Sequence, residues 1–536
     1  MPHAAFVIHD TKDGVRQARF DGHRFVTHRV EIGFRQTDVR SHPGDDALIV
    51  DVACPSAGLS WVVLRWDVPW SSDLLILGDA WERSYGDLSW RHFEPGRVLP
   101  WSWLGYEPAT HTTLGHGVKV RPRAFCSWTV DEGGYSLWLD VRNGGGPVHL
   151  GERVLEAATL VGTAAGSNKS PFELQQDLTA AMCDDPMPVA EPVVGCNNWY
   201  YAYGQNFGPA QILRDAETIV EYADGHPVRP FCVVDAGWTP GGGAPGGPWT
   251  AGTLGTFDDM PGFAADIKTR GARPGIWMRP AALTVVDDPA RLRPGPRPAR
   301  ELPLDLTLQG NLDTIREDVA RIVGWGFELV KHDFSTFDAF GRFGPAMGAE
   351  LTDPGWHFAD QSRTNAEILL RLYEVIREGA GEATLIGCNT VGHLAAGLVE
   401  VQRIGDDTSG RDWERTRRMG VNTLAYRLAQ HGRFFVADAD CVPCTPRTPW
   451  EKNRQFLDLV ARSGTALFVS VDPRSRNPQV DADLRAAVRL ALDGGDAGGV
   501  EPLDWLYSTT PRGWLTASGR RTYDWAEPFG VSPIGV

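Results

Sequence analysis

The first third of the chain alternates short apolar stretches with turn residues and shows little helical periodicity. Residues 47–52 (ALIVDV) and 59–64 (LSWVVL) are two such stretches, each with the length of a β-strand. The pattern predicts an N-terminal β-sandwich domain over residues 1–180. Around residues 163–190 the pattern becomes polar and mixed, which is typical of a connection between domains.

From about residue 193 the rhythm changes, because apolar, β-branched runs now alternate with amphipathic helical segments. Within 311–324, Ile315, Val319 and Ile322 recur at helical spacing, and residues 364–378 also form one apolar face. Glycines after both segments mark where these helices end. We count eight strand-like runs, at 193–200, 230–236, 273–279, 327–334, 384–389, 398–405, 434–440 and 465–471.

Eight strand–helix units in this length predict a central (β/α)8 TIM barrel over residues 190–480. An open, doubly wound sheet is the alternative, but no G-x-G-x-x-G motif follows the first strand. Residues 495–536 are rich in tryptophan and turn residues, and they predict a small C-terminal β appendage. The fold class is therefore multidomain, with β and α/β parts.

Composition narrows the function classes. The net charge of −16 argues against nucleic acid or an acidic membrane surface as partner, because both need basic protein surface. The sequence has no run of about 18 apolar residues, and its start lacks a basic region followed by an apolar stretch. The eight scattered cysteines are unlike a secreted disulfide framework, so we expect a cytoplasmic protein.

Carboxylates and cations stand at the ends of the predicted barrel strands, where the active sites of such barrels lie. Asp235 ends the second strand, Lys331 and Asp333 the fourth, and Asp407 the sixth. Because side chains alternate along a strand, Lys331 and Asp333 can share a face. Lys331 would favour the ionised form of Asp333, and the adjacent Asp406 could raise the pKa of Asp407.

Paired carboxylates among tryptophan walls, without a metal-ligand set, indicate glycoside hydrolysis. That chemistry needs one ionised and one protonated carboxyl on either side of an anomeric carbon. For any single aspartate, a helix cap is the simpler interpretation. That all of them are caps is harder to accept, since Lys331 and Arg403 occupy the same strand ends.

These residues carry a resemblance to glycoside hydrolase family 36, the α-galactosidases of clan D, over roughly residues 190–450. The Lys-x-Asp and Arg-Ile-Gly-x-Asp motifs, in this order, are the specific part of it. The segment 77–83 is also similar to a sandwich-domain segment of that family, whose loop reaches the sugar site. The motifs are Gly275-Ile276-Trp277, Lys331-x-Asp333-Phe334, Ile386-Gly387-Cys388, Arg403-Ile404-Gly405-x-Asp407-Thr408 and Arg433-Phe434-x-x-x-Asp438-x-Asp440-Cys441.

The resemblance implies a retaining double displacement on an oligosaccharide or glycoside, without cofactor or metal. Asp333 would be the nucleophile, and Asp407 the general acid and then the base, with carboxyl groups about 5–5.5 Å apart. Family relatives are often oligomeric, so a homo-oligomer is also expected. The residues implied to contact the sugar are Asp235, Trp199, Trp277, Lys331, Cys388, Arg403 and Trp81.

Two departures from the family pattern concern the sugar subsite. Ala236 stands where a second acid is usual, and Arg279 adds a cation. These changes suggest a modified galacto-configured sugar, such as α-galacturonide, β-L-arabinopyranoside or α-N-acetylgalactosaminide, with Arg279 as a contact for a carboxylate. The alternative is that Arg279 pairs with Asp235 or Asp259, while the loop arginines 291, 293, 297 and 300 are solvated.

Weaker signals leave further alternatives open. The loop 241–247 could close over the cleft and bring Trp249 onto a leaving sugar, or it could be a plain insertion. His332 and His393 could belong to a metal-dependent hydrolase, but the first strand carries no H-x-H motif. The single C-x-x-C pair, Cys441 and Cys444, has no matching ligands. A sugar-binding protein on an inactive barrel is the third hypothesis.

Overall fold

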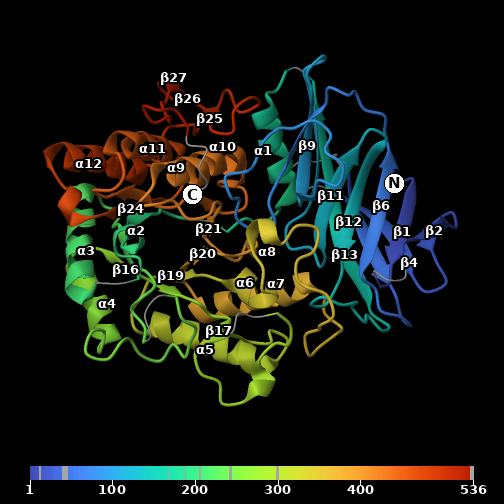
Figure 1. Cartoon of the computed structure of the whole chain (residues 1–536), viewed down its shortest axis with the longest axis horizontal. Coiled ribbons are helices and arrows are strands. Elements are labelled where there is room, and N and C mark those ends of the chain that lie inside the picture. Colours follow the sequence, from blue (N-terminus) through green and yellow to red (C-terminus); the bar gives the residue numbers. More distant parts are fainter. Residues whose placement is uncertain are drawn as a thin grey trace.

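The computed structural model describes residues 1–10, 14–38, 46–166, 168–187, 189–204, 207–240, 244–296 and 301–531, and the structural statements below refer to these. Figure 1 shows an N-terminal region made of strands beside a larger α/β region, with the last strands lying over one side of the latter. The predicted succession of a β-rich part, an α/β part and a short β part is therefore observed.

The N-terminal sheet has thirteen strands, and every pairing within it is antiparallel. Its inner face is apolar, as the alternating pattern predicts, with Val62, Leu64 and Leu137 fully buried. The strands are β1 (Ala4–Ile8), β2 (Arg16–Phe20), β3 (Phe25–Val26), β4 (Glu31–Asp38), β5 (Asp46–Ala53), β6 (Trp61–Asp67), β7 (Leu75–Gly78), β8 (Leu99–Pro100), β9 (Ser102–Glu107), β10 (Thr112–Val118), β11 (Phe125–Asp131), β12 (Gly134–Asp140) and β13 (Val154–Ala165).

The α/β region is built on a parallel sheet, and each of the eight predicted runs contains one of its strands. They are β14 (Val194–Asn197), β15 (Phe231–Val234), β16 (Arg273–Met278), β19 (Leu329–His332), β20 (Thr384–Gly387), β21 (Val401–Arg403), β22 (Val436–Asp438) and β24 (Leu467–Val471). Each pairs with the next in chain order, and β24 pairs with β14. A parallel bridge between Asp438 and Ala466 joins β22 to the start of β24, so the eight strands form a ring.

Helices follow these strands and cover the ring on the outside (Figure 1). The two helices predicted from periodicity are present, as α5 (Gln309–Gly324) and α7 (Asn365–Ala380). Each of the longer helices buries one apolar face. This burial, and not intrinsic propensity, supplies most of the stability of an amphipathic helix. The others are α3 (Pro209–Ala223), α4 (Met260–Thr269), α11 (Trp450–Ser463) and α12 (Pro478–Leu492), with the short α2 (Trp199–Ala202), α6 (Ser335–Phe340), α8 (Gly392–Ala395), α9 (Trp413–Thr416) and α10 (Thr423–Arg427).

The predicted polar connection at 163–190 is in part wrong. Strand β13 continues to Ala165, and α1 (Pro171–Met182) follows, with Phe172, Leu174 and Leu178 buried. The Ser170 hydroxyl accepts a hydrogen bond from the backbone N–H of Glu173, and the Glu173 carboxylate accepts one from the backbone N–H of Ser170. This capping box was readable in the sequence.

The remaining strands are short. Strands β17 (Ala282–Leu283) and β18 (Leu302–Pro303) pair in the loop after β16, and β23 (Val442–Cys444) lies beside β24. The C-terminal part forms a three-stranded antiparallel sheet from β25 (Glu501–Pro502), β26 (Gly513–Thr516) and β27 (Gly519–Thr522). Within the described ranges, no helix is long and apolar enough to span a bilayer.

Candidate active site

A cavity of about 290 Å³ lies at the carboxyl ends of the parallel strands. It gathers side chains that follow β14, β15, β16, β19, β20 and β21, together with one from the N-terminal region. Parallel strands present all their carboxyl ends on one face of the ring, which explains this convergence. The lining residues are Arg83, Trp199, Asp235, Ala236, Ala244, Trp277, Lys331, Asp333, Phe334, Phe343, Asn389, Asp406, Asp407 and Arg415.

An ion pair on the cavity wall joins the ends of β15 and β19, the two strands on either side of β16. The Nζ of Lys331 lies 2.7 Å from Oδ2 of Asp235, which also accepts a hydrogen bond of 2.6 Å from the amide of Asn197. Both partners are largely buried. Lys331 precedes Asp333 by two residues, and both side chains line the same cavity.

Asp333 is held mainly by neutral donors. Its Oδ1 accepts the backbone N–H groups of Phe334 at 2.8 Å and Asn389 at 3.1 Å, and its Oδ2 accepts the indole N–H of Trp277 at 3.1 Å. Burial opposes the charge, but Arg83, Lys331 and these hydrogen bonds keep the pKa of Asp333 below its ordinary value. An ionised carboxylate that is fixed in orientation suits a nucleophile.

The residue after Asp333 holds an unusual backbone conformation. Phe334 has φ of 62°, in the left-handed region that residues with a β-carbon seldom adopt. This turn ends β19 and begins α6, and it brings the Phe334 N–H back onto the carboxylate of Asp333. Local strain that orients one functional group is common at active sites.

Asp406 and Asp407, which follow β21, are held by guanidinium groups instead. Asp406 pairs with Arg83 at 3.2 Å and with Arg415 at 2.6 Å. Asp407 lies 3.1 Å from Arg403 and 3.7 Å from Arg83, and its side chain is 36% exposed. The two carboxylates therefore share Arg83.

The sequence prediction that Asp406 raises the pKa of Asp407 is wrong. Burial does raise it, but Arg403, Arg83 and Lys331 outweigh burial and lower the pKa of Asp407 to about 2. Asp406 has no comparable effect because its charge is taken up by Arg83 and Arg415. In the free protein Asp407 is thus ionised at neutral pH.

No protein-family model and no curated protein matches this sequence, but solved structures match its fold. An α-galactosidase from Thermus thermophilus, solved with p-nitrophenyl α-D-galactopyranoside, aligns with a TM-score of 0.60 at 17% identity, covering 92% of this chain and 97% of its own. The family 36 α-galactosidase AgaA of Geobacillus stearothermophilus aligns at 0.57 and 13% identity, covering 92% and 74%. An α-galactosidase from Lactobacillus brevis aligns at 0.56 and 13% identity, covering 88% and 69%.

The chain has the α-galactosidase fold. This confirms at the level of fold the resemblance that the motifs suggested. Because the identities are below one fifth, the comparison shows the architecture, and the chemistry has to be argued from the side chains of this chain.

Five of the residues predicted to contact sugar or catalyse do line the cavity of this α-galactosidase fold together: Asp235, Lys331, Asp333, Asp407 and Trp277. Trp199 lines it as well, from the first turn of α2. Phe334 and Phe343 add two aromatic faces that the prediction did not include. The cavity thus combines carboxylates with aromatic surface, as sugar binding requires.

Three predicted sugar contacts lie behind the cavity wall instead. Trp81 is buried against Trp101 and Phe125, and its indole N–H donates to the carbonyl of Gly348. Cys388 and Arg403 are each 1% exposed. Arg403 forms ion pairs with Asp407 at 3.1 Å and with Asp440 at 3.0 Å. These residues support the lining residues but are not among them.

Arg279 is also outside the cavity, which contradicts its predicted role as a sugar contact. It is 2% exposed and pairs with Asp338 at 2.5 Å and Glu301 at 2.7 Å. Its guanidinium lies 4.5 Å from the ring centre of Phe334, and Phe334 itself lines the cavity. The predicted alternative partners, Asp235 and Asp259, are wrong too.

The other loop predictions fare similarly. Arg291 hydrogen-bonds Asn311 and Thr314, and Arg293 is buried and donates to the carbonyl of Asp338, so neither is simply solvated. Trp249 is 1% exposed and donates to the carbonyl of Arg279, so it is a core residue. Residues 241–243 of the glycine-rich loop, and arginines 297 and 300, lie outside the described residues.

The histidines of the metal hypothesis are not in the cavity. The ring of His332 lies beside that of Tyr373 of α7, and burial lowers the pKa of His332 to about 4. His393 stacks on Trp101 and hydrogen-bonds the carbonyl of Val118 at 2.8 Å. Cys441 and Cys444 are buried free thiols, and no group of three metal-ligating side chains occurs in the described ranges.

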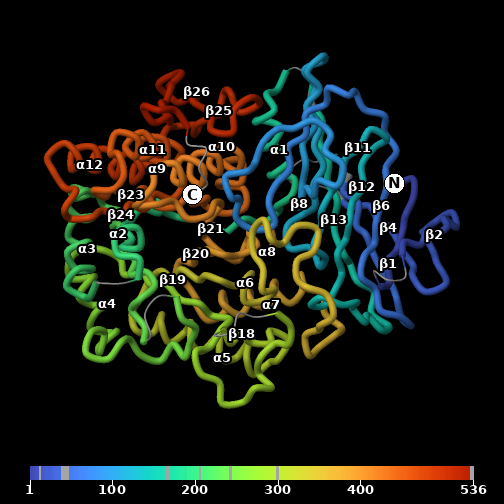
Figure 2. The backbone as a smooth tube through the Cα atoms, in the orientation of Figure 1, coloured from blue at the N-terminus to red at the C-terminus, as the bar shows by residue number. Residues whose placement is uncertain are grey.

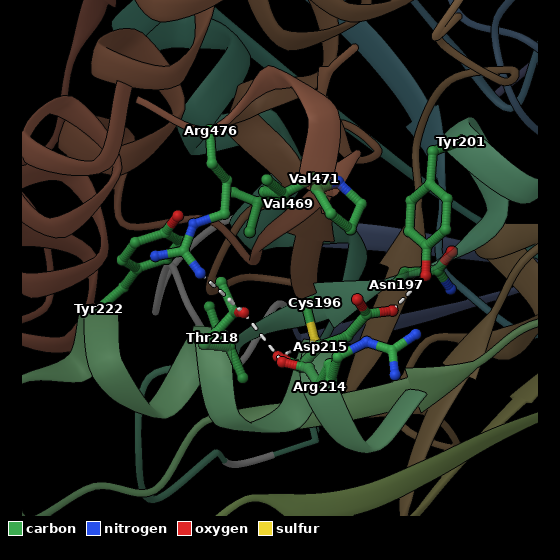
Figure 3. Close-up of a pocket in the computed structure, with 12 residues that line it drawn as sticks. Cys196, Asn197, Tyr201, Arg214, Asp215, Thr218, Tyr222, Val469, Val471 and Arg476 are labelled. Carbon is green, nitrogen blue, oxygen red and sulfur yellow. Dashed lines mark hydrogen bonds between the residues drawn. The ribbon is translucent and has the colours of Figure 1, made fainter. Parts of the chain in front are cut away.

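A second, smaller cavity of about 110 Å³ lies between α3 and strands β14 and β24 (Figure 3). Tyr201 donates a hydrogen bond to Asp215, whose pKa is raised to about 7 by burial. Asn197 borders this cavity and also donates to Asp235 in the larger one. The small cavity therefore lies behind the Asp235–Lys331 pair.

Sequence reasoning missed Arg83, Arg415, Asn389 and Phe343 as lining residues. Asn389 follows a predicted strand end and could have been chosen by the rule that selected Asp333. Arg83 stands two residues after Trp81, within the segment already singled out, but the wrong side chain was selected. Arg415 and Phe343 come from helix and loop positions with no sequence signal.

Proposed function

We propose that this protein is a retaining exo-glycosidase of α-galactosidase type. The observation that carries the proposal is the placement of Asp333 and Asp407 on one cavity of sugar-binding character, at the carboxyl ends of β19 and β21. Two carboxyl groups facing one small cavity are the requirement of glycoside hydrolysis. The shared fold supports this chemistry, and the side chains of the cavity carry the argument.

In the first step a carboxylate oxygen of Asp333 attacks the anomeric carbon as the glycosidic bond breaks. The leaving oxygen takes a proton from Asp407, which is ionised in the free protein and therefore takes up that proton in the complex with substrate. In the second step Asp407 accepts a proton from water, whose oxygen bonds to the anomeric carbon, and the ester bond breaks to restore the carboxylate of Asp333. No cofactor enters either step.

We infer that the sugar is neutral. The cavity-lining cations Lys331, Arg83 and Arg415 are each paired with a carboxylate of the same cavity. Arg279, which suggested an anionic sugar, is neutralised elsewhere. Ala236 gives the wall beside Asp235 a methyl group, which supports keeping β-L-arabinopyranosides among the candidate substrates with α-galactosides.

The domain organisation proposed with this function is a sandwich over 1–180, a barrel over 190–480 and an appendage over 495–536. All eight cysteines are free and buried, which supports a reducing, cytoplasmic setting. A homo-oligomer stays a prediction.

The deciding experiment replaces Asp333 with alanine and assays aryl glycosides. Turnover should fall by a factor on the order of 10⁴ or more, and azide should partly restore it by forming a glycosyl azide of inverted configuration. Nuclear magnetic resonance of the wild-type product should show the substrate's anomeric configuration first. Full activity of the variant, or inversion by the wild type, would end the assignment.

A further inference from the structure

The loop that follows β7 leaves the N-terminal sheet and lies along the barrel. Ser84 forms a parallel bridge with Gly405, through hydrogen bonds of 3.0 Å to the carbonyl of Ile404 and 2.9 Å from the N–H of Asp406. In Figure 2 this blue segment runs beside the orange tube of the barrel's second half. The loop, residues 79–88, thus pairs with the chain just after β21, next to the two acidic residues that follow this strand.

The loop is also anchored to the barrel region before this bridge. Arg427 of α10 lies 2.8 Å from the carboxylate of Asp79, and it donates to the carbonyl of Glu82 at 2.6 Å. The carboxylate of Glu82 is buried and accepts hydrogen bonds from Asn389 and, at 3.0 Å, from the N–H of Gly344. Main-chain pairing and buried polar contacts of this kind fix both backbone and side chains.

Arg83 is the residue of this loop that enters the cavity. It is 7% exposed, and one guanidinium contacts both acids that follow β21: Asp406 at 3.2 Å and Asp407 at 3.7 Å. The hydroxyl of Tyr85 lies 3.3 Å from its Nη2. The bridge at Ser84 sets the height of Arg83 relative to these acids, since it pairs the adjacent residues of both segments.

Asp407 has several other charged neighbours. Arg403, from β21, lies 3.1 Å away but also serves Asp440 on the far side. Arg415, from α9, contacts the Asp407 carbonyl and the Asp406 carboxylate. Lys331 attracts Asp407 from β19, Asp333 repels it, and the phenol of Tyr200 faces it from α2. Of the cations, Arg83 alone comes from the N-terminal region.

We propose that Arg83 is a positioning residue for Asp407, and that the acid–base half of the active site is complete only when the 79–88 loop is docked on the barrel. Arg83 contacts Asp406 and also Oδ1 of Asp407, the same oxygen that Arg403 contacts. A carboxylate oxygen shared by two guanidinium groups keeps a fixed direction, which general acid–base transfer needs. This role rests on the proposed function, because it acts through the acid–base residue.

The test compares Arg83→Met, Arg83→Lys and Arg427→Met, measured as kcat against pH on an oligosaccharide and an activated aryl glycoside. Loss of the Arg83 charge should lower kcat for the oligosaccharide by about 10–100-fold and displace its basic limb, which reports the acid in the substrate complex, upward by about 1–2 pH units. Arg83→Lys should keep the wild-type limb. Arg427→Met loosens the loop without contacting Asp407, so it should lower kcat with a less displaced limb.

The outcomes separate cleanly. If Arg83→Met and Arg427→Met lose the same activity with an unmoved basic limb, Arg83 only anchors the loop and the proposal is overturned. If Arg83→Met does not fold, Arg83→Lys decides, because a lysine variant whose limb leaves the wild-type position would contradict the role. A wild type that hydrolyses no glycoside refutes the proposed function first and this role with it.

Discussion

The two halves of the cavity hold their carboxylates by different means. Asp333 receives hydrogen bonds from two backbone N–H groups and an indole, all from residues of the barrel. Asp407 is set among guanidinium groups, one of which comes from the N-terminal loop. Hydrogen bonds from neutral donors fix the orientation of a carboxylate and oppose the loss of its charge only weakly. Neighbouring cations instead stabilise the negative charge of the carboxylate.

The difference teaches which half is intrinsic to the barrel. The hydrogen bonds that orient Asp333 need only neighbouring strands in register, since Trp277 pairs with Lys331 and β20 follows β19 in the sheet, although Arg83 also helps to keep this carboxylate ionised. The Asp407 half requires a segment more than 300 residues away in sequence to be docked. The acid–base function is therefore the one exposed to changes at the interface between the two regions.

The largest effect on the comparison should come from Asp407→Ala. We expect a drop of about 10²–10⁴-fold in kcat/KM for oligosaccharides, whose leaving oxygen needs a proton, and a far smaller one for aryl glycosides with acidic leaving groups. The measurement is kcat/KM against leaving-group pKa. A uniform loss across the series would show that Asp407 is not the acid.

Lys331→Met should affect the Asp235 side of the cavity. Because Asp235 is 2% exposed, losing its partner strands a buried charge, and we expect about 3–5 kcal/mol of destabilisation together with a raised KM. Thermal unfolding and initial rates measure the two effects. The double variant with Asp235→Asn should recover stability but not KM. Recovery of both would mean that the pair is purely structural.

The acid side of the pH profile should report unfolding and not titration of the site. In the free protein nearby cations lower the pKa values of Asp333 and Asp407 from the ordinary 3.8, which moves their titration away from the range between pH 4 and 6.5. Buried His332 and half-buried His116 and His431 have pKa values near 4, below the 6.5 of an unfolded chain. They contribute stability above pH 6.5 that is lost as the pH falls toward 4.

Carboxyls with raised pKa values act in the opposite direction. The raised pKa values of Asp215, about 7, and Asp438, about 6, give stability that is lost as the pH rises from 3.8 through those values. The histidine contribution should lower the melting temperature from pH 6.5 to 4 together with activity, and substitution separates it from the contribution of the carboxyls. His116→Phe should reduce that fall, while the same change at exposed His149 should not. Activity lost at constant melting temperature would contradict the prediction.

The smallest effect is expected from Ala236→Asp, which adds a second acid beside Asp235. If the methyl group of Ala236 selects against a hydroxyl at C6, the variant should prefer α-galactosides more strongly. We expect the ratio of α-galactoside to β-L-arabinopyranoside turnover to rise about tenfold, because the new carboxylate can hydrogen-bond the C6 hydroxyl that the arabinoside lacks. The ratio of kcat/KM values measures it. An unchanged ratio, in a variant that melts like the wild type, would remove Ala236 from the specificity argument.

The sequence by itself determined the order of the eight parallel strands and the acids at their ends. Each strand is a local apolar run, and a parallel ring brings every carboxyl end to one face, so Asp235, Lys331, Asp333 and Asp407 could be placed without coordinates. The helix α1 was equally local, and its capping box was overlooked.

Only the tertiary structure decided which cations serve the site. Arg279 and Arg83 look alike in the sequence, yet Asp338 and Glu301 bury the first behind Phe334, while a strand-like bridge at Ser84 carries the second into the cavity. The pKa of Asp407 follows from these placements and not from its neighbour Asp406. Electrostatic effects depend on distance in space, and no local pattern encodes contacts between residues hundreds of positions apart.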